Sequence, residues 1–236
     1  MTPTSRNPNA LPMYIQISEL LIRDIAAGRL IDGERLPPER DMAAELQVSV
    51  GTLRKSLAEL EKKGMLERIQ GSGNYVRETG TQNSVYAMFR LELPEGGGLP
   101  RADILSVDQL EKPDDLPEFG KSNIGSRVRR MRYLNDTIIA VEEIWLDESV
   151  GLIDQNLLSD SLYRYYQQQL GFWISRAEDR VSVGLLPHWT PPGFTKPIGE
   201  TVGYIERFSW SEKPDPVEFS KTWFDADRAT YVQRLK

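Results

Sequence analysis

Apolar residues in the first third of the chain recur with the spacing of short helices. Those between Tyr14 and Ile25 predict a first helix that ends near Ala27, with Gly28 as its C-terminal stop. A proline pair at 37–38 sets the first turn of a second helix, whose buried side is expected to carry Met42, Ala43 and Leu46.

A third helix and a hairpin follow. Ser49 is a good N-cap for this helix, which has a core stripe and an outward side. The stripe consists of Leu53, Leu57 and Leu60, and the outward side consists of Thr52, Arg54 and Lys55. Residues 65–69 and 75–76 then alternate like two short strands around the flexible turn Gln70-Gly71-Ser72-Gly73. The pattern predicts a winged helix-turn-helix that ends at residue 76.

This arrangement suits DNA. A helix such as the third one fits a major groove, and the small residues let the wing approach a phosphate backbone. The alternative is a small helical domain whose hairpin binds nothing. We favour DNA binding because Thr52, Arg54 and Lys55 lie together on the outward side, without acidic residues among them.

Three separated motifs resemble the DNA-binding domain of the GntR family of bacterial repressors. They are Leu36-Pro37-x-Glu39-Arg40, Val48-Ser49-x-Gly51-Thr52-Leu53-Arg54 and Gln70-Gly71-x-Gly73. The resemblance implies that the residues that contact the major groove are Arg40, Ser49, Thr52 and Arg54. It implies that the minor groove or the backbone is contacted by Gln70 and Gly71, and Lys55 and Gly73 complete the predicted DNA-binding set. Pro38 stands where the family usually has Ser, and Val50 where it commonly has Arg.

Composition narrows the possible partners. The chain has 236 residues and no cysteine, which excludes disulfides and thiolate metal sites. With no signal peptide and no segment apolar enough to cross a membrane, we expect a soluble, cytoplasmic protein.

The net charge is −6, yet residues 1–78 hold 11 Lys and Arg against 11 Asp and Glu. A DNA-binding domain this weakly charged predicts modest affinity per monomer, and therefore a homodimer.

The rest of the chain predicts a second domain. Residues 77–84 contain no apolar residue and predict a linker, so the two domains span residues 1–76 and 85–236. Strand-like segments lie at residues 85–93, 102–110, 127–133, 137–145, 173–186, 201–210 and 217–225. Further predictions are a mobile loop at 94–100, an irregular or short helical region at 113–120, a hairpin turn at Asn135-Asp136, and a helix at 160–170 stopped by Gly171. The predicted fold class is α+β, with a mainly antiparallel sheet behind the winged helix-turn-helix.

Short motifs of the second domain resemble, in their order, the UTRA domain of the HutC subfamily. They are Arg130-x-Arg132, Val141-Glu142, Ser161-Leu162-Tyr163, Arg176-Ala177-Glu178 and Pro216-Val217-Glu218-Phe219-Ser220. The resemblance implies a chorismate-lyase-like fold that binds a small metabolite, such as a sugar phosphate or urocanate, and that dimerises.

The residue types themselves point to an anionic ligand. Arg130 and Arg132 are two apart on a strand and share a face, where their guanidinium groups could bind a phosphate or carboxylate bidentately. If the hairpin turn holds three residues rather than two, Glu142 lies opposite Arg130. A helix beginning at Ser161 adds free N–H groups and a favourable dipole, with the hydroxyls of Ser161 and Tyr163 as directional partners. The alternative is that these charged residues form solvated ion pairs of little energetic consequence.

The resemblance to sugar-phosphate-binding members extends this set of effector contacts. It implies ligand contacts at Arg130, Arg132, Glu142, Ser161, Tyr163 and Glu218. Phe89 and Arg90 lie where the family also contacts effectors. Phe224 stands where those members tend to have Tyr, which removes a hydroxyl contact and points to a different ligand.

Other residue types give no catalytic pattern. We find no nucleophile–base pair, metal cluster or phosphate loop, and expect neither a metal nor a cofactor. His188, the only histidine, lies in a proline-rich loop. Trp145, Trp210 and Trp223 are expected in the core or at a dimer interface.

These patterns predict a cytoplasmic, homodimeric repressor that binds a double-stranded DNA operator and is released by a small anionic effector. Two alternatives stay open. One is a DNA-binding protein whose C-terminal domain only dimerises, and the other is an enzyme with a lyase-like fold.

Overall fold

The computed structural model describes residues 11–77, 86, 88–158 and 161–234. The chain divides into two compact units. The head unit comprises Leu11–Arg90 and the chain end from Tyr231, and the sheet unit comprises Leu91–Thr230.

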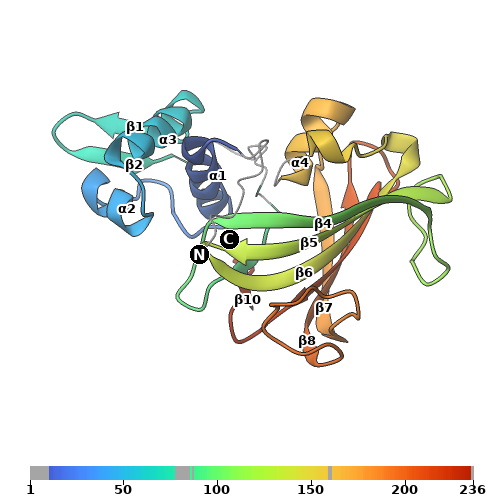
Figure 1. Ribbon diagram of the computed structural model, residues 1–236. Helices are drawn as coiled ribbons and strands as arrows, with labels where there is room; N and C mark the ends of the chain where they lie inside the picture. Colours follow the sequence, from blue (N-terminus) through green and yellow to red (C-terminus); the bar gives the residue numbers. More distant parts are fainter. Residues whose placement is uncertain (1–10, 78–85, 87, 159–160, 235–236) are drawn as a thin grey trace. The chain divides into compact units, whose positions relative to one another are not determined.

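The head unit is a winged helix-turn-helix. Its elements are α1 (Met13–Ala26), α2 (Glu39–Glu45), α3 (Val50–Lys62), β1 (Leu66–Ile69) and β2 (Gly73–Val76), drawn in blue to turquoise in Figure 1. Ser49 caps α3 as predicted, because its Oγ accepts a hydrogen bond of 3.1 Å from the backbone N–H of Thr52. The prolines expected inside α2 precede it, and Pro38 is the last residue before the helix.

One apolar core fixes the three helices of the head unit. The stripe predicted for α3, Leu53, Leu57 and Leu60, is fully buried against apolar residues of α1 and α2. Gln47 makes the turn before α3 with a positive φ of 54°. Because the core side of α3 is fixed in this way, its opposite side is presented to solvent.

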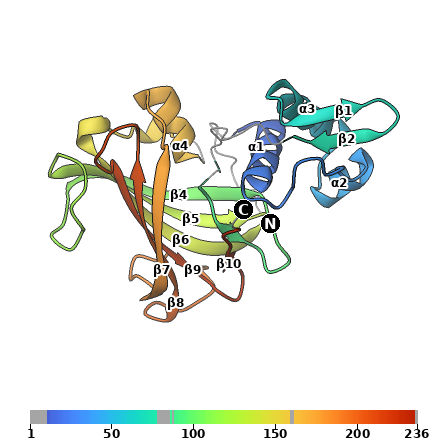
Figure 2. The ribbon, with the colours of Figure 1, turned by 180° about the vertical axis from the view of Figure 1, so that it is seen from behind.

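The sheet unit is built on one antiparallel sheet of six strands in the order β4-β5-β6-β9-β8-β7. The strands are β4 (Pro100–Glu111), β5 (Ile124–Leu134), β6 (Thr137–Asp147), β7 (Arg176–Leu185), β8 (Thr201–Trp210) and β9 (Glu218–Phe224). Figures 1 and 2 show a strong twist, with β4 to β6 running across the direction of β7 to β9. The predicted antiparallel sheet is confirmed.

Short helical segments pack on one face of this sheet. They are η1 (Glu148–Val150), η2 (Gln155–Leu157), α4 (Leu162–Tyr165) and the π-helical turn η3 (Tyr166–Leu170), which ends at Gly171 as predicted. Val128, Ile144 and Leu146 of the sheet pack against apolar residues of these segments. We call this side of the sheet the helix face, and the other side the loop face.

The hairpin of β5 and β6 shows how the register arises. The turn holds two residues, Asn135 and Asp136, between the paired Leu134 and Thr137. Farther along, the register shifts next to Arg132, because Ile139 forms a bulge. The extra residue is therefore in the strand rather than in the turn, and the pairing of Arg130 with Glu142 is confirmed.

Two predicted elements differ from the structure. Among the described residues of the strand predicted at 85–93, only β3 (Leu91–Glu92) is a strand, paired with the two-residue β10 (Thr230–Tyr231), and residues 85 and 87 lie outside the described part of the chain. The N–H of Phe89 instead donates to the Tyr86 carbonyl, which closes a turn. The helix predicted at 160–170 is a short α-helix followed by a π-turn, and Asp160 lies outside the described residues, as do residues 78–84 of the predicted linker.

Candidate functional site

The outward side of α3 carries exposed polar groups. The Ser49 and Thr52 hydroxyls lie 2.9 Å apart at its N-terminus, and Lys55 is exposed one turn farther on. Arg54 is 64% exposed, and its Nε lies 2.6 Å from Oε2 of Glu39 on α2. Its hydrogen bond to Arg54 lowers the pKa of the Glu39 carboxyl. This ion pair orients the Arg54 guanidinium while leaving most of it in solvent.

The wing adds a second exposed edge. Gln70 and Gly71 lie at the tip of the hairpin, and Gly71 has a φ of +75° that favours glycine. Gly73 has a φ of +138°, and a Cβ there would lie 3.0 Å from Nε of Arg35. Gly73 thus makes room for the Arg35 side chain beside the wing.

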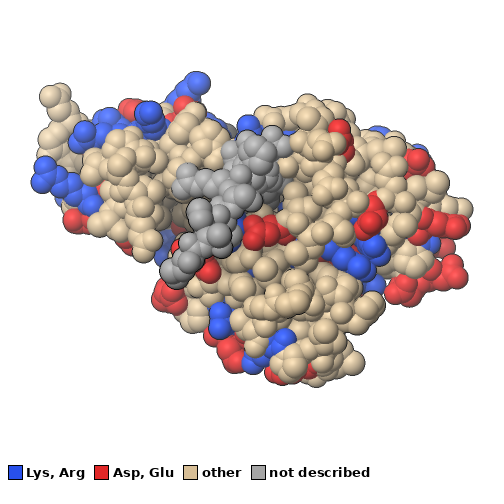
Figure 3. All heavy atoms as spheres, in the orientation of Figure 1, with Lys and Arg blue, Asp and Glu red and all other residues tan. Residues whose placement is uncertain are grey.

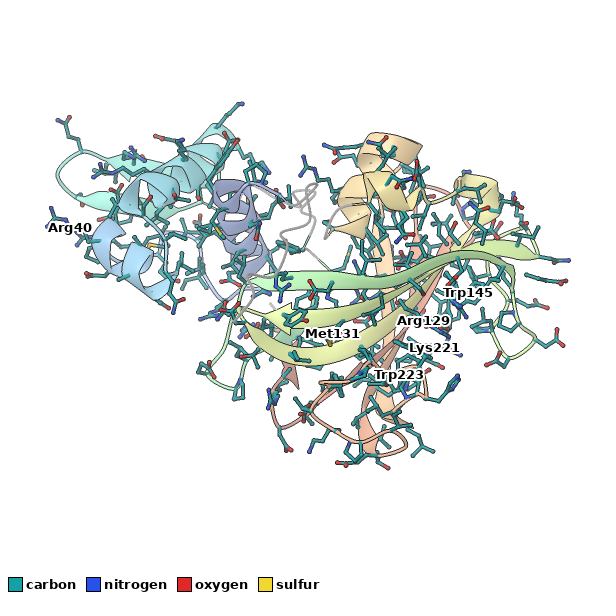
Figure 4. All side chains as sticks on the ribbon, viewed as in Figure 1. Arg40, Arg129, Met131, Trp145, Lys221 and Trp223 are labelled. Carbon is teal, nitrogen blue, oxygen red and sulfur yellow. The ribbon has the colours of Figure 1, made fainter. Side chains whose placement is uncertain are left out.

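Two basic residues near these positions were missed by the sequence analysis. Arg35 joins the wing through a backbone bridge to Tyr75, and Arg68 of β1 is close enough to Glu39 to lower its pKa. A basic residue that alternates on a short strand gives no signal without the partner strand. Figure 3 shows Lys and Arg side chains gathered over α2, α3 and the hairpin, and Figure 4 shows Arg40 pointing outward from α2.

The helix face of the sheet unit holds a buried cluster of two arginines and one glutamate. Arg130 donates to Oε2 of Glu142 from Nε at 3.1 Å and from Nη2 at 2.6 Å. Arg132 donates to the same oxygen from Nη1 at 3.2 Å. The side chains of Arg130 and Arg132 are only 6% and 9% exposed. These residues are therefore not solvated surface groups.

The electrostatics of this cluster favour a charged carboxylate. Burial alone would raise the pKa of Glu142, but the charges of Arg130 and Arg132 outweigh burial and lower it to about 2. Both guanidinium groups converge on one oxygen, Oε2, while Oε1 accepts a long 3.5 Å hydrogen bond from Thr222. The cluster carries one net positive charge, which suits an anionic ligand.

Glu218 holds the helical segments on the sheet. Its Oε2 accepts a hydrogen bond of 2.6 Å from the Tyr166 hydroxyl. Its Oε1 accepts hydrogen bonds from the hydroxyls of Ser209, at 2.7 Å, and Tyr163, at 3.4 Å. Burial raises the pKa of the Glu218 carboxyl above its ordinary value. The three hydroxyls come from α4, η3 and β8, so Glu218 has a structural role that the sequence analysis did not foresee.

A third arginine on the helix face was missed. Arg207 of β8 binds Asp179 of β7 through two parallel hydrogen bonds, from Nε at 2.5 Å and from Nη2 at 2.7 Å. Its charge also acts on Glu142 and Tyr163. The signal that could have revealed it is the spacing of Arg207 and Ser209, which are two apart on one predicted strand.

Two further predicted effector contacts of the sheet unit are Phe224 and Ser161, which contact Gly203 and Arg164 respectively. Phe224 follows Thr222 on the helix face, and its ring lies over Gly203, where an added Cβ would come within 2.3 Å of the ring. The Ser161 hydroxyl is buried and accepts a 3.4 Å hydrogen bond from the N–H of Arg164. The structure therefore brings together Arg130, Arg132, Glu142, Tyr163 and Glu218.

Phe89 and Arg90 belong to the head unit. The Arg23 guanidinium of α1 lies 5.8 Å from the centre of the Phe89 ring. The Nε of Arg90 donates a hydrogen bond of 2.9 Å to Oε1 of Gln233. The Arg90 carbonyl accepts a hydrogen bond from the N–H of Val232. These contacts join residues 89–90 to α1 and to the end of the chain.

The three tryptophans expected in the core or at a dimer interface lie on the loop face. Trp145 and Trp223 are 2% and 8% exposed and belong to its apolar clusters, while Trp210 stacks beneath Arg176 at 3.8 Å. Figure 4 shows Trp145 and Trp223 together with Arg129, Met131 and Lys221 along β5, β6 and β9. His188 is exposed in a loop.

The described residues provide neither a metal site nor a membrane-spanning helix. They hold no group of three or more His, Cys, Asp or Glu side chains that could bind a metal ion. In the same part of the chain, the helices are too short or too polar to span a membrane.

Two domain families match this chain. Residues 13–76 match the family described as bacterial regulatory proteins, gntR family, and residues 95–230 match the UTRA domain. The two matches fall on the winged helix-turn-helix and on the six-stranded sheet, respectively.

Similar proteins match over nearly the whole length. The HTH-type transcriptional regulator SmoD of Agrobacterium fabrum is 54% identical over 96% of this chain and 97% of its own. The HTH-type transcriptional repressor NagR of Bacillus subtilis is 25% identical over 95% of each chain. The crystal structure of the possible transcriptional regulator YydK from Bacillus subtilis superposes with a TM-score of 0.55 at 22% identity, covering 96% of this chain and 100% of that one.

Proposed function

The chain belongs to the GntR family of bacterial regulatory proteins and carries a UTRA domain, and from this premise we propose that it is a repressor released from its operator by a small anionic effector. The family assignment makes it a DNA-binding transcriptional regulator that responds to a small molecule, and not an enzyme. The proposal adds the direction of regulation, the charge of the effector and the residues involved.

The observation that carries the proposal is the buried cluster of Arg130, Arg132 and Glu142. Both arginines donate to one carboxylate oxygen, and the three side chains together carry a net charge of +1. A phosphate or carboxylate would balance this charge and could accept hydrogen bonds from a planar guanidinium group bidentately. Glu142 would then bind hydroxyls of the same ligand.

In the head unit, we assign DNA contacts to the exposed side of α3 and to the wing. Thr52, Arg54 and Lys55 would read or approach the major groove, with Ser49 and Arg40 on the flanking backbone or bases. Gln70, Gly71 and Gly73 would let the wing contact the minor groove or the phosphates. Arg35 and Arg68 would add positive charge beside them.

Regulation would follow from a homodimer. Two heads must match successive groove faces of a pseudo-palindromic operator, about 34–36 Å apart or a multiple of it. Residues 77–84 are the proposed linker through which effector binding changes the separation of the heads. Repression agrees with the similar NagR of Bacillus subtilis, which is an HTH-type transcriptional repressor.

A thermal-shift screen tests the proposal. Purified protein is heated with phosphorylated sugars, phosphonates, amino-acid catabolites and other small anions, since a bound ligand stabilises by mass action. We expect a saturable rise in melting temperature with one class of anion, which Arg132→Ala abolishes. No shift with any anion would contradict the anionic effector and favour a C-terminal domain that only dimerises.

A further inference from the structure

Glu39 lies where the three elements of the head unit that carry predicted DNA contacts meet. It is the first residue of α2, and its Oε2 accepts a hydrogen bond of 2.6 Å from Nε of Arg54 on α3. The wing is close as well, since Asn74 of β2 donates a side-chain hydrogen bond to Glu39 and Arg68, opposite Asn74 in the hairpin, adds a positive charge. The hydrogen bond from Arg54, followed by these contacts of the wing, lowers the pKa of the Glu39 carboxyl, which is therefore ionised at neutral pH.

The Arg54 guanidinium is held on one side only. Its Nε–H donates to Glu39, while 64% of the side chain is exposed. Among the described residues, no other group accepts a hydrogen bond from its Nη1 and Nη2 atoms. Paired N–H groups of this kind bind O6 and N7 of a guanine in the major groove. Glu39 can therefore stay bound to Arg54 while Arg54 binds a base.

The pair of Arg54 and Glu39 has no net charge, and this affects phosphates and bases differently. A phosphate that approaches Arg54 also approaches the Glu39 carboxylate, which repels it. Exchange of the carboxylate for one phosphate brings little net attraction, because one anion replaces another. The acceptor atoms of guanine carry no full charge, so the carboxylate opposes them much less. The pair therefore disfavours contact with the DNA backbone more than contact with a base.

We propose that Glu39 is a specificity-determining residue, which prevents Arg54 from binding the phosphates of any DNA sequence and directs it to a guanine of the operator. The inference rests on the DNA contacts assigned to α3 in the proposed function. Glu39 itself need not touch DNA, so its role is to position Arg54. The equal numbers of acidic and basic residues in 1–78 agree with a head that limits non-specific attraction.

Removing the charge of Glu39 tests the proposal. Glu39→Gln keeps the size of the side chain and one oxygen acceptor. The intact protein is titrated, at several salt concentrations, into a labelled duplex that the wild type selects from random-sequence DNA and into a scrambled version of that duplex. We expect tighter binding of the scrambled duplex and a salt slope steeper by about one for each head. The ratio of the two affinities should fall by about tenfold.

Asp41→Asn is the matched control. It removes the same charge from the same helix, at an exposed residue that lies two positions from Glu39 and therefore faces another side. Its effect on the two duplexes should be equal, so the ratio of affinities stays that of the wild type. An unchanged ratio in Glu39→Gln, or an equal fall in Asp41→Asn, would overturn the proposal.

The Arg54→Ala background separates this proposal from the proposed function. In this background Glu39→Gln should no longer lower the ratio of affinities, because no guanidinium is left to bind phosphate. The same fall with and without Arg54 would overturn the proposal alone. Wild-type affinity of Arg54→Ala for the selected duplex would overturn the DNA contacts assigned to α3 and this proposal with them.

A second substitution separates charge from position. Glu39→Asp keeps the carboxylate but is one methylene shorter, so it cannot hold Nε of Arg54 at the same place. We expect weaker binding of the selected duplex, with wild-type binding and salt slope for the scrambled duplex. A purely structural role of Glu39 would lower the melting temperature of both variants without this opposite pattern, and that result would contradict the proposal.

Discussion

The predicted DNA contacts of the head unit and the predicted effector contacts of the sheet unit differ in their access to water. The Arg54 side chain is 64% exposed and shares one ion pair with Glu39, whereas Arg130 is 6% exposed and shares Glu142 with Arg132. Both pairs join an arginine to a glutamate at 2.6 Å. The same chemistry is therefore used at a surface and in an interior.

The difference matches the size of the proposed ligands. An exposed arginine can exchange its carboxylate partner for a DNA phosphate. Salt weakens each such arginine–phosphate contact, so tight binding needs several of them together. A buried pair has already lost its water, so its orientation is fixed before a ligand arrives. A long polyanion suits the first arrangement, and a small anion suits the second.

Removing one carboxylate from each pair should produce the largest contrast. Glu142→Ala leaves two buried guanidinium groups without this partner, so we expect the sheet unit to lose about 3–5 kcal/mol of unfolding free energy. Glu39→Ala removes the exposed counterpart and should lose less than about 1 kcal/mol. Urea unfolding of both variants measures the contrast, and equal losses would contradict it.

Operator binding should depend on the exposed arginine of the head unit, and effector binding should not. Arg54→Ala should weaken binding of a specific operator by about 1–3 kcal/mol and leave the effector-induced thermal shift unchanged. Fluorescence anisotropy with labelled operator DNA provides the measurement. Unchanged operator affinity in this variant would show that the outward side of α3 does not contact the bases.

The N-cap of α3 allows a smaller, purely local test. Ser49→Ala removes the acceptor for the Thr52 N–H and should destabilise the head unit by about 1 kcal/mol. Ser49→Asp restores an acceptor and should recover most of that stability. Thermal unfolding followed by circular dichroism distinguishes the two variants, and equal melting temperatures would argue against the cap.

The pH dependence of stability should show the smallest effect, with opposite signs at two buried carboxyls. The pKa of Glu142 is lowered from 4.5 to about 2, so its contribution is present above pH 4.5 and is lost as the pH falls toward 2. The pKa of Glu218 is raised, so its contribution is complete below pH 4.5 and is lost as the pH rises through its folded value. Glu218→Gln should therefore flatten the decline above pH 4.5, and an unchanged slope would contradict this assignment.

Local patterns explain why the head unit was predictable. The Ser49 cap and the stripe of Leu53, Leu57 and Leu60 depend on residues three or four positions apart. The wing follows from the glycines of one short turn. In each case the residues that determine the structure lie within a few positions of the element.

The sheet unit depended on pairings that no local pattern contains. The shared face of Arg130 and Arg132 followed from strand alternation, but the position of Glu142 depended on a bulge at Ile139 that leaves no sequence signal. The pairing of Arg207 with Asp179 depends on the register of β7 and β8, whose facing residues are 28 positions apart here. The three hydrogen bonds that Glu218 accepts from hydroxyl groups depend on the packing of α4 and η3 against the sheet.

The most direct test of the account measures operator release. Labelled operator DNA is bound to the wild type, to Arg132→Ala and to Arg54→Lys, and the anion identified by the thermal-shift screen is titrated into each complex. We predict release of the wild type at concentrations that saturate the thermal shift, and of Arg54→Lys at the same concentrations, while Arg132→Ala stays bound. Release of Arg132→Ala at the wild-type concentration would contradict an effector site at the buried arginine cluster.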